Sequence, residues 1–198
     1  MTSSYHHGNL KEALLQTASR LINNGNRDKL TIRHLAEQCH VSASAAYRHF
    51  ASKDDIIKTI AAQGFEQFTD FINHRVQHLR NPVDRLHQHG IAYVQFALDN
   101  PHLFRLLFSS ILTSDKKSKR LKIASQTNYE LLIDTIEDGI KQKLLTGESK
   151  TLILATWSMV HGLATLLINQ ATEITAADQQ RVISQVTRTL HHGILSPK

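Results

Sequence analysis

The sequence predicts an all-α protein, and three observations lead to that prediction. Apolar residues recur at helical spacing, and no long stretch alternates with the two-residue period of a strand. Glycine and proline are scarce, with 8 and 3 residues among 198. Asn81–Pro82 and Asn100–Pro101 each combine a capping residue with a proline suited to the first helical turn. These signals divide the chain into about nine helices.

Caps and stop signals place the expected helices along the chain. Ser, Thr, Asp and Asn at a helix start accept hydrogen bonds from the first turn, and Gly or Asn often follows the last turn. Asn9, Thr31, Ser42, Ser52 and Thr175 are such caps, and Asn24–Gly25 is a stop signal. The expected helices are 10–24, 32–39, 43–50, 53–78, 82–99, 101–112, one after the polar segment 113–119 that ends near 145, one from 149, and one from 176 to about 192.

Composition limits the classes of protein that the chain can represent. Lys and Arg exceed Asp and Glu by 23 to 17, so the net charge of +6 favours an anionic partner only mildly. Cys39 is the single cysteine, which makes an intramolecular disulfide impossible and fits a cytoplasmic setting. Residues 151–172 carry no Asp, Glu, Lys or Arg, but polar side chains such as His161 lie around that helix. A buried helix of a soluble protein is therefore expected there, in preference to a membrane span.

Residues 30–53 predict a helix-turn-helix unit. Two short helices meet at a turn formed by His40 and Val41, over a small apolar core. Small side chains at the start of the second helix let its backbone approach base edges in a major groove, and donors suited to phosphate flank them. The same periodicity also fits an ordinary pair of amphipathic helices. The candidate DNA-binding residues are Thr31, Arg33, Ser42, Ala43, Ser44, Ala45, Tyr47, Arg48, His49 and Lys53.

The order of residues in this segment resembles the DNA-binding domain of the tetracycline-repressor (TetR-like) family of bacterial transcription regulators. The resemblance covers roughly the first fifty-five residues. It implies a three-helix DNA-binding domain followed by a larger helical domain that dimerises and often binds a small ligand. It also implies that Tyr47, His49 and Lys53 contact phosphates. The matching residues are Thr31, Ile32, Arg33, Leu35, Ala36, Val41, Ser42, Tyr47, Arg48, His49, Phe50, Ser52 and Lys53.

The sequence departs from the family pattern at two positions. His40 stands where glycine is most frequent, so either a non-glycine residue takes positive φ or the turn differs slightly. Ala45 replaces a commonly hydroxylated residue, which leaves an apolar base contact or none at that position. Residues 5–10 are similar to an arm found in one family branch. From such an arm His6 and His7 would reach the DNA backbone; the alternative is a disordered tail.

The charge-free helix carries a second resemblance. Trp157, His161 and Gly162 resemble the Trp-His-Gly (WHG) signature of one branch of C-terminal domains, and Trp157 and His161 share a helix face. They are either packed core residues or the border of a ligand pocket. A helix that is apolar nearly all round must be buried on several sides, which a homodimer through the last two helices would provide. The candidate pocket residues are Tyr93, Phe96, Phe104, Phe108, Tyr129, Trp157 and His161.

Motifs of catalysis and of metal binding do not occur in the sequence. There is no P-loop, no glycine-rich dinucleotide turn, no G-x-S-x-G and no H-E-x-x-H. His74 and His78 have the spacing of a chelating pair, but no third ligand at fixed spacing joins them. We therefore expect no metal, no cofactor and no enzymatic activity.

These observations favour a cytoplasmic, homodimeric transcriptional regulator, in the leading hypothesis a ligand-responsive repressor that binds a palindromic operator. The expected domains are a helix-turn-helix domain at 1–55, a connecting helix at 56–80, and a ligand-binding and dimerisation domain at 81–198. One alternative is an architectural or weakly selective DNA-binding protein without a small-molecule ligand. Another is a helical enzyme or ligand carrier in which the helix-turn-helix is incidental.

Overall fold

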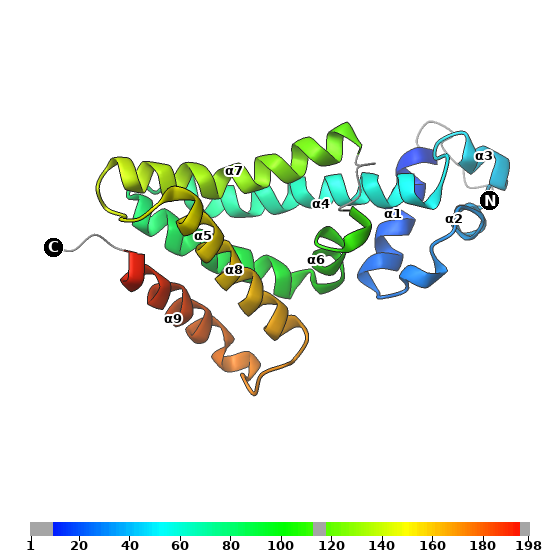
Figure 1. Ribbon diagram of the computed structural model, residues 1–198. Coiled ribbons are helices and arrows are strands. Elements are labelled where there is room, and N and C mark those ends of the chain that lie inside the picture. Colours follow the sequence, from blue (N-terminus) through cyan, green and yellow to red (C-terminus); the bar gives the residue numbers. More distant parts are fainter. Residues whose placement is uncertain (1–9, 113–117, 195–198) are drawn as a thin grey trace. The chain divides into compact units, whose positions relative to one another are not determined.

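The computed structural model describes residues 10–112 and 118–194, and within these ranges the chain forms helices and no strand (Figure 1). The prediction of an all-α fold with about nine helices is thereby confirmed. The elements are α1 (Leu10–Asn23), η1 (Arg27–Lys29), α2 (Ile32–Gln38), α3 (Ala43–Tyr47), α4 (Lys53–Val76), α5 (Pro82–Asp99), α6 (Pro101–Leu107), η2 (Ser110–Leu112), α7 (Lys119–Lys141), α8 (Ser149–Ile168) and α9 (Ala176–Ile194), where η denotes a 3₁₀ helix.

The predicted caps at Thr31, Ser42, Ser52, Asn81 and Thr175 are confirmed, whereas the Asn100 side chain donates to the Phe96 carbonyl of α5 at 3.1 Å. The side chains of Thr31, Ser42 and Ser52 accept hydrogen bonds from the backbone N–H groups three residues later, at 3.1, 3.2 and 3.2 Å. Asn81 accepts from Val83 N–H at 2.8 Å, and Thr175 accepts from Asp178 N–H at 3.3 Å. Each bond satisfies a donor that the helix itself leaves without a partner, so short polar side chains determine where these helices begin. The cap predicted at Asn9 and the arm with His6 and His7 lie outside the described residues.

Three predicted helix ends are wrong. The helix that begins at Ala43 ends at Tyr47 and not at Phe50. The helix that begins at Pro101 ends at Leu107, and a 3₁₀ turn replaces its last residues. The helix α7 ends at Lys141 and not near Leu145, because Lys143 adopts a φ of 57° and the N–H groups of Leu144 and Leu145 bond back to the Gly139 carbonyl. This arrangement resembles the left-handed termination that Gly or Asn usually provides, and nothing about a lysine signals it in the sequence.

Contacts between Cα atoms group the described residues into two compact units. The first comprises 10–64, 102–112 and 118–122, and the second comprises 65–101 and 123–194. In the first unit α1, α2 and α3 pack against one another. Gly25 ends α1 with a φ of 73°, and the N–H of Asn26 bonds to the Leu21 carbonyl at 2.8 Å, which reverses the chain before α2. The predicted domain bounds at 55 and 80 remain a prediction.

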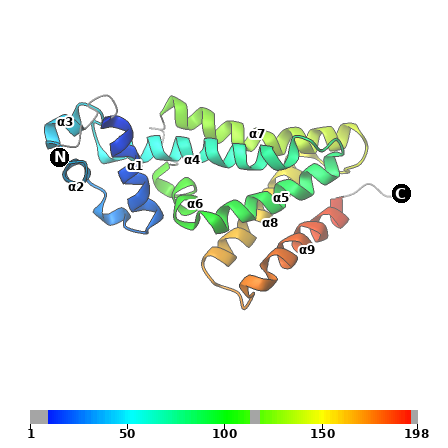
Figure 2. The ribbon, with the colours of Figure 1, turned by 180° about the vertical axis from the view of Figure 1, so that it is seen from behind.

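In the second unit α5 packs against both α8 and α9, which also pack against each other (Figure 2). An apolar cluster lies where α5, α7 and α8 meet, and Trp157 packs against it from the side. Arg85 of α5 forms an ion pair with Asp138 of α7. The buried members of the cluster are Leu86, Leu132, Ile136, Leu145, Leu152 and Ile153.

The charge-free helix α8 is buried along one side only. It is the one helix in the described part of the chain that is long and apolar enough to cross a membrane. Of its most apolar stretch of 18 residues, 33% is buried. A core helix of a soluble protein passes the same test. Thr156, Val160 and Leu163 belong to its buried side, whereas Leu154 and Leu166 are 59% and 46% exposed. Within the described residues, a second apolar side of α8 is thus left uncovered.

Gly90 allows the close approach of α5 to α9. A Cβ atom at this position would lie 2.8 Å from Thr187 Cγ2 and 3.4 Å from Val160 Cγ1. Thr187 is 1% exposed, and its hydroxyl donates to the Ile183 carbonyl and is bonded to His87 Nδ1, so it has little freedom to move. The helices therefore require a residue without a side chain at position 90.

We expect Gly90→Ala to lower the free energy of unfolding by about 1–2 kcal/mol, because the overpacking cost exceeds the gain in helix propensity. Gly193→Ala is the matched control, since nothing lies within 4 Å of a Cβ there. Urea unfolding of both variants measures the difference. Equal stability of the two would contradict the close packing of α5 and α9.

Candidate nucleic-acid interface

The turn between α2 and α3 has the chain reversal that a helix-turn-helix unit needs. His40 adopts a φ of 55°, its N–H bonds to the Glu37 carbonyl at 3.1 Å, and the N–H of Val41 bonds to the Ala36 carbonyl at 2.9 Å. Of the two forms considered for this turn, the structure has the one with a non-glycine residue at positive φ. That conformation costs about 1–2 kcal/mol relative to a right-handed one, and the two bonds across the turn offset it.

A small core holds α3 against α1 and α2. The side chains that form it are buried except for Val41, which is half-buried. The Thr17 hydroxyl of α1 lies 3.6 Å from Cys39 Sγ, so the cysteine is part of this packing. Because these positions face inward, the other side of α3 is turned to solvent. The buried core residues are Leu35, Ala36, Cys39, Ala46 and Phe50.

The solvent side of α3 begins with small residues. Ser42 and Ser44 are exposed, and their hydroxyl oxygens lie 3.0 Å apart. Ala43 and Ala45 are half-buried. A surface of hydroxyl and methyl groups lets a helix backbone come close to base edges, and either group can discriminate between bases. The structure thus brings together the four residues at the start of α3 that the sequence predicted.

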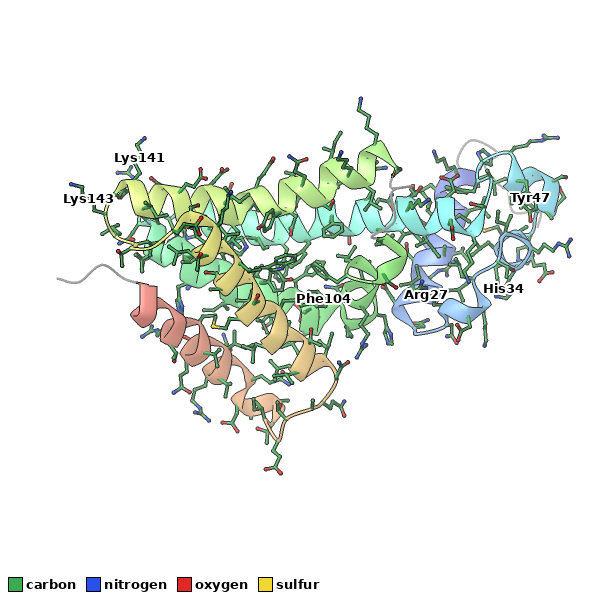
Figure 3. The ribbon with its side chains drawn as sticks, in the orientation of Figure 1. Arg27, His34, Tyr47, Phe104, Lys141 and Lys143 are labelled. Carbon is green, nitrogen blue, oxygen red and sulfur yellow. The ribbon has the colours of Figure 1, made fainter. Side chains whose placement is uncertain are left out.

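Larger donors follow at the end of α3. Tyr47 is 51% exposed, and Arg48 and His49 are exposed in the turn after it. Figure 3 labels Tyr47 on α3, together with His34 of α2 and Arg27 of η1. Lys53 is half-buried, and its Nζ donates to the Arg27 carbonyl at 3.5 Å. An ammonium group has three donors, so this bond leaves donors of Lys53 for a phosphate.

The start of α2 adds two further candidates. Thr31 uses its hydroxyl oxygen to cap the helix, and its O–H remains a donor. Arg33 is exposed on the first turn. His34 Nδ1 lies 3.8 Å from a Glu37 carboxylate oxygen on the same helix. Thr31 and Arg33 therefore present donors of the kind that fix a protein on the phosphate backbone.

The first turn of α4 is poorly suited to bind an anion. Ser52 caps the N–H of Asp55, and a carboxylate oxygen of Asp55 lies 3.4 Å from the N–H of Ala51. The acidic side chains of Asp54 and Asp55 stabilise the helix start but repel phosphate. Phosphate contact at this point therefore depends on the ammonium of Lys53 more than on the backbone. Sequence reasoning missed the η1 turn, whose Arg27 carbonyl holds that ammonium, because three residues carry no periodicity.

The second unit holds a hydrogen-bonded group of aromatic side chains. The Trp157 indole N–H donates to the Tyr93 hydroxyl at 3.2 Å, and that hydroxyl lies 2.9 Å from His161 Nδ1. Since the hydroxyl accepts from Trp157, its own proton is available for His161 Nδ1, which favours the imidazole tautomer protonated at Nε2. The Tyr129 ring lies 5.4 Å from the Trp157 ring. Burial raises the pKa of Tyr93 and lowers the pKa of His161, so both are neutral at pH 7.

The structure brings together only part of the predicted pocket set. Tyr93, Tyr129, Trp157 and His161 form the group described above. Phe96 joins it through Phe68, whose ring lies 4.2 Å from Phe96 and 5.0 Å from Tyr93. Phe104 and Phe108, by contrast, belong to the first unit, where their rings lie 4.8 Å apart.

No group of three or more His, Cys, Asp or Glu side chains among the described residues is placed to hold a metal ion. His87 ties α5 to α9, because its Nδ1 lies 3.1 Å from the Thr187 hydroxyl.

Comparison with known proteins gives a family for both parts of the chain. Residues 14–60 match the family described as bacterial regulatory proteins, tetR family. Residues 86–190 match the tetracyclin repressor-like C-terminal domain. The nucleoid occlusion factor SlmA of Marinomonas sp. (strain MWYL1) is 28% identical over 137 residues, which are 69% of this chain and 66% of that protein. The SlmA protein of Vibrio cholerae is 27% identical over 69% of this chain and 67% of its own length.

Solved structures share the fold. A protein of unknown function from Rhodococcus sp. RHA1 superposes with a TM-score of 0.86 at 23% identity, over 98% of this chain and 99% of that one. A putative tetR family regulator from Shewanella sp. PV-4 superposes with a TM-score of 0.70 at 16% identity, over 95% and 99%. Helix-turn-helix geometry, exposed donors and two family matches agree: the chain belongs to the tetR family of bacterial regulatory proteins and is a DNA-binding transcriptional regulator.

Proposed function

We propose that the protein is a homodimeric repressor that binds a palindromic operator and releases it in response to a small ligand. The observation that carries the proposal is the solvent side of α3, where Ser44 and Ala45 are followed by Tyr47. This surface reads few bases, so two copies are needed to select a site, and a dimer with two-fold symmetry selects a palindrome. We assign DNA reading to residues 1–55, connection to 56–80, and ligand binding and dimerisation to 81–198.

Within the reading unit we assign two kinds of contact. Ser44 and Ala45, with Ser42 and Ala43 beside them, approach base edges. Tyr47, His49 and Lys53 hold the phosphates of one strand, while Thr31 and Arg33 hold those of the other. Arg48 is exposed next to both groups and serves either purpose.

The dimer is proposed to form through α8 and α9. Exposed residues of α8 share one broad side, which includes Leu154, Ala155, Ser158 and Leu166. A Cβ at Gly162 on this side would meet nothing within 4 Å in the same subunit. Apolar and small residues that a single chain leaves exposed on a helix are typical of a surface that a second helix covers. The assignment to the WHG branch likewise remains a prediction, resting on Trp157, His161 and Gly162.

The ligand is proposed to act at the aromatic group of Tyr93, Tyr129, Trp157 and His161. These residues join α5, α7 and α8, so a guest that rearranges them moves the helices that carry the dimer surface. Repression would end when the two reading heads no longer match the spacing of successive major grooves. A ligand has this effect only if it prefers one dimer geometry to the other. With DNA as its target, we place the protein in the cytoplasm.

Substitution of the phosphate-holding residues tests the proposed interface. We expect Tyr47→Phe to weaken binding about tenfold on all DNA sequences, since one hydrogen bond to a charged group is lost. Lys53→Ala is expected to reduce the salt slope of log K by about one. Operator sequences selected from random DNA provide the substrate, and binding is measured against salt concentration.

The matched control is Lys141→Ala, which removes the same charge from the end of α7 in the second unit (Figure 3). It is expected to leave the salt slope unchanged. Ser44→Ala should instead alter the selected sequence. An unchanged salt slope in Lys53→Ala would contradict the proposed phosphate contact.

A second candidate function is DNA binding without a small-molecule effector. The observation that favours it is the similarity to proteins named nucleoid occlusion factors. The two candidates differ in two measurable ways. An architectural or weakly selective protein binds random and selected DNA almost equally, whereas an operator-binding repressor prefers the selected sequence by about 10³-fold or more. Only the repressor loses affinity when a ligand occupies the second unit.

A further inference from the structure

Three deeply buried polar atoms in the second unit have no hydrogen-bond partner, each with less than 1 Å² of exposed surface. One is Nε of Arg85, whose guanidinium is paired with Asp138 through another nitrogen. The other two are Nδ1 of His89 on α5 and the hydroxyl oxygen of Thr156 on α8. His89 and Thr156 are only 5% and 4% exposed as whole residues. Because buried polar groups in proteins are nearly always hydrogen-bonded, two such atoms on neighbouring helices indicate a partner molecule with polar atoms of its own.

Their positions place them beside the aromatic group. His89 lies one turn before Tyr93 on the same face of α5. Thr156 directly precedes Trp157 and shares a face of α8 with Val160, one turn further on. Val160 Cγ1 lies 3.4 Å from the Cβ position of Gly90, the residue next to His89. The face of α8 that carries Thr156 therefore packs against α5 beside His89.

The groups around this position are neutral hydrogen-bonding groups and aromatic rings. Burial lowers the pKa of His89 to about 4, so its imidazole is uncharged at pH 7, as are Tyr93 and His161. The charged side chain one turn before His89 is Arg85, and it is paired with Asp138. The charges of Arg85 and Asp138 compensate each other, so a charged guest would find no unpaired opposite charge to offset its lost hydration, which is a large cost in a buried site.

We infer that the effector is an uncharged small molecule with an aromatic or apolar body and a hydroxyl group, and that His89 and Thr156 recognise that hydroxyl. A hydroxyl both donates and accepts, so it satisfies an imidazole nitrogen and a threonine hydroxyl together. The aromatic rings of Trp157 and Tyr129 would pack against the apolar body of this molecule. The inference rests on the proposed ligand response and adds two residues to the pocket that the sequence predicted.

A matched set of small aromatic compounds tests the inference. Benzyl alcohol, toluene, benzoate and benzylammonium share a ring and differ in polarity and charge. Emission from Trp157, the only tryptophan of the chain, reports binding, because its indole N–H is bonded to Tyr93. We expect benzyl alcohol to bind in the millimolar range typical of molecules of this size. It should bind about tenfold more tightly than the other three, since toluene leaves both polar atoms unsatisfied and the ions are charged.

Two variants identify the recognising side chains. His89→Leu and Thr156→Val are each expected to reduce the preference for benzyl alcohol over toluene to about twofold or less. Both should fold, because apolar replacement of unpartnered buried groups is neutral or stabilising, and urea unfolding checks this. Thr135→Val is the control: this threonine is also 5% exposed, but its hydroxyl already donates to the Leu131 carbonyl at 2.8 Å. Its variant should keep the full preference.

The outcomes separate this inference from the proposed function. Tightest binding by benzoate or benzylammonium, no binding at about 10 mM, or a preference that survives in both variants each overturns the inference. If a charged compound binds and causes the protein to release the operator, the ligand-responsive function is supported and the inference of an uncharged effector is wrong. If benzyl alcohol binds with the expected preference and operator affinity never changes, the recognition is supported and the ligand-responsive function is wrong.

Discussion

Leu154→Glu combined with Leu166→Glu is expected to convert the protein into a folded monomer that binds its operator about 10²–10⁴-fold more weakly. Both side chains are largely exposed in one subunit, so charging them should change the stability of the fold by no more than about 0.5 kcal/mol. In a dimer through α8 the four introduced carboxylates would be buried together and would repel one another. Loss of the dimer removes the second reading head, and with it the gain in effective concentration.

Ile123→Glu is the matched control for the dimer surface. Ile123 is 55% exposed on α7, so the change introduces one carboxylate, against two in the double variant, on a similarly exposed apolar side chain outside α8 and α9. This variant should stay dimeric and bind DNA as the wild type does. Sedimentation measures the oligomeric state, and operator titration measures affinity. A dimeric Leu154→Glu/Leu166→Glu protein would exclude the proposed interface.

Acidification from pH 6.5 to 4 is expected to lower the free energy of unfolding by about 3 kcal/mol through His89 alone. The pKa of His89 is about 4 in the folded protein against an ordinary value of 6.5, and burial is the cause. Below pH 6.5 the unfolded chain binds a proton at this residue and the folded protein does not. Stability is therefore complete above the unfolded pKa and is lost as the pH falls toward the folded pKa.

The variant His89→Leu removes this contribution. Urea unfolding at a series of pH values should give a profile that falls by about 3 kcal/mol less than that of the wild type over the same range. His87 and His161 also have lowered pKa values, so the remaining slope has the same sign. Hydrogen bonds lower the pKa values of Asp138, Glu148 and Asp178 from their ordinary values, so these carboxyls add a loss of the same sign toward the acid end of this range and below it. Parallel profiles for the two proteins would refute the assignment.

The parts of the fold that local chemistry determines could be predicted from the sequence. Thr31 and Ser42 cap helices because their short side chains place an oxygen within hydrogen-bond distance of the backbone N–H three residues later. Positive φ at His40 was one of the two alternatives for this turn, because the family pattern has glycine there, and the structure has that one. The same residues position the candidate DNA surface, which is why that surface was accessible to sequence reasoning.

The parts that depend on distant residues could not be predicted. The end of α7 at Lys141 depends on Leu145 entering the apolar cluster with Leu86, and no local signal marks that contact. Phe104 looked equivalent to Tyr93 as a pocket residue because both are aromatic, but only the fold assigns them to different units. His89 and Thr156 were overlooked because a missing hydrogen-bond partner is a property of three-dimensional packing and not of spacing.

The contacts of Thr187 with Gly90 and His87 fix α9 to α5, so that the two helices are expected to move together. Thr187 fills the space beside Gly90 and is bonded through its hydroxyl to His87, so it meets α5 at adjacent turns. Val160 of α8 packs against Gly90 from another side. Such a joint resists sliding, since any shift of α9 would break a hydrogen bond and drive a methyl group into backbone. In the proposed homodimer, a ligand that rearranges Tyr93 is therefore expected to move α5, α8 and α9 together and to tilt the two subunits without separating them.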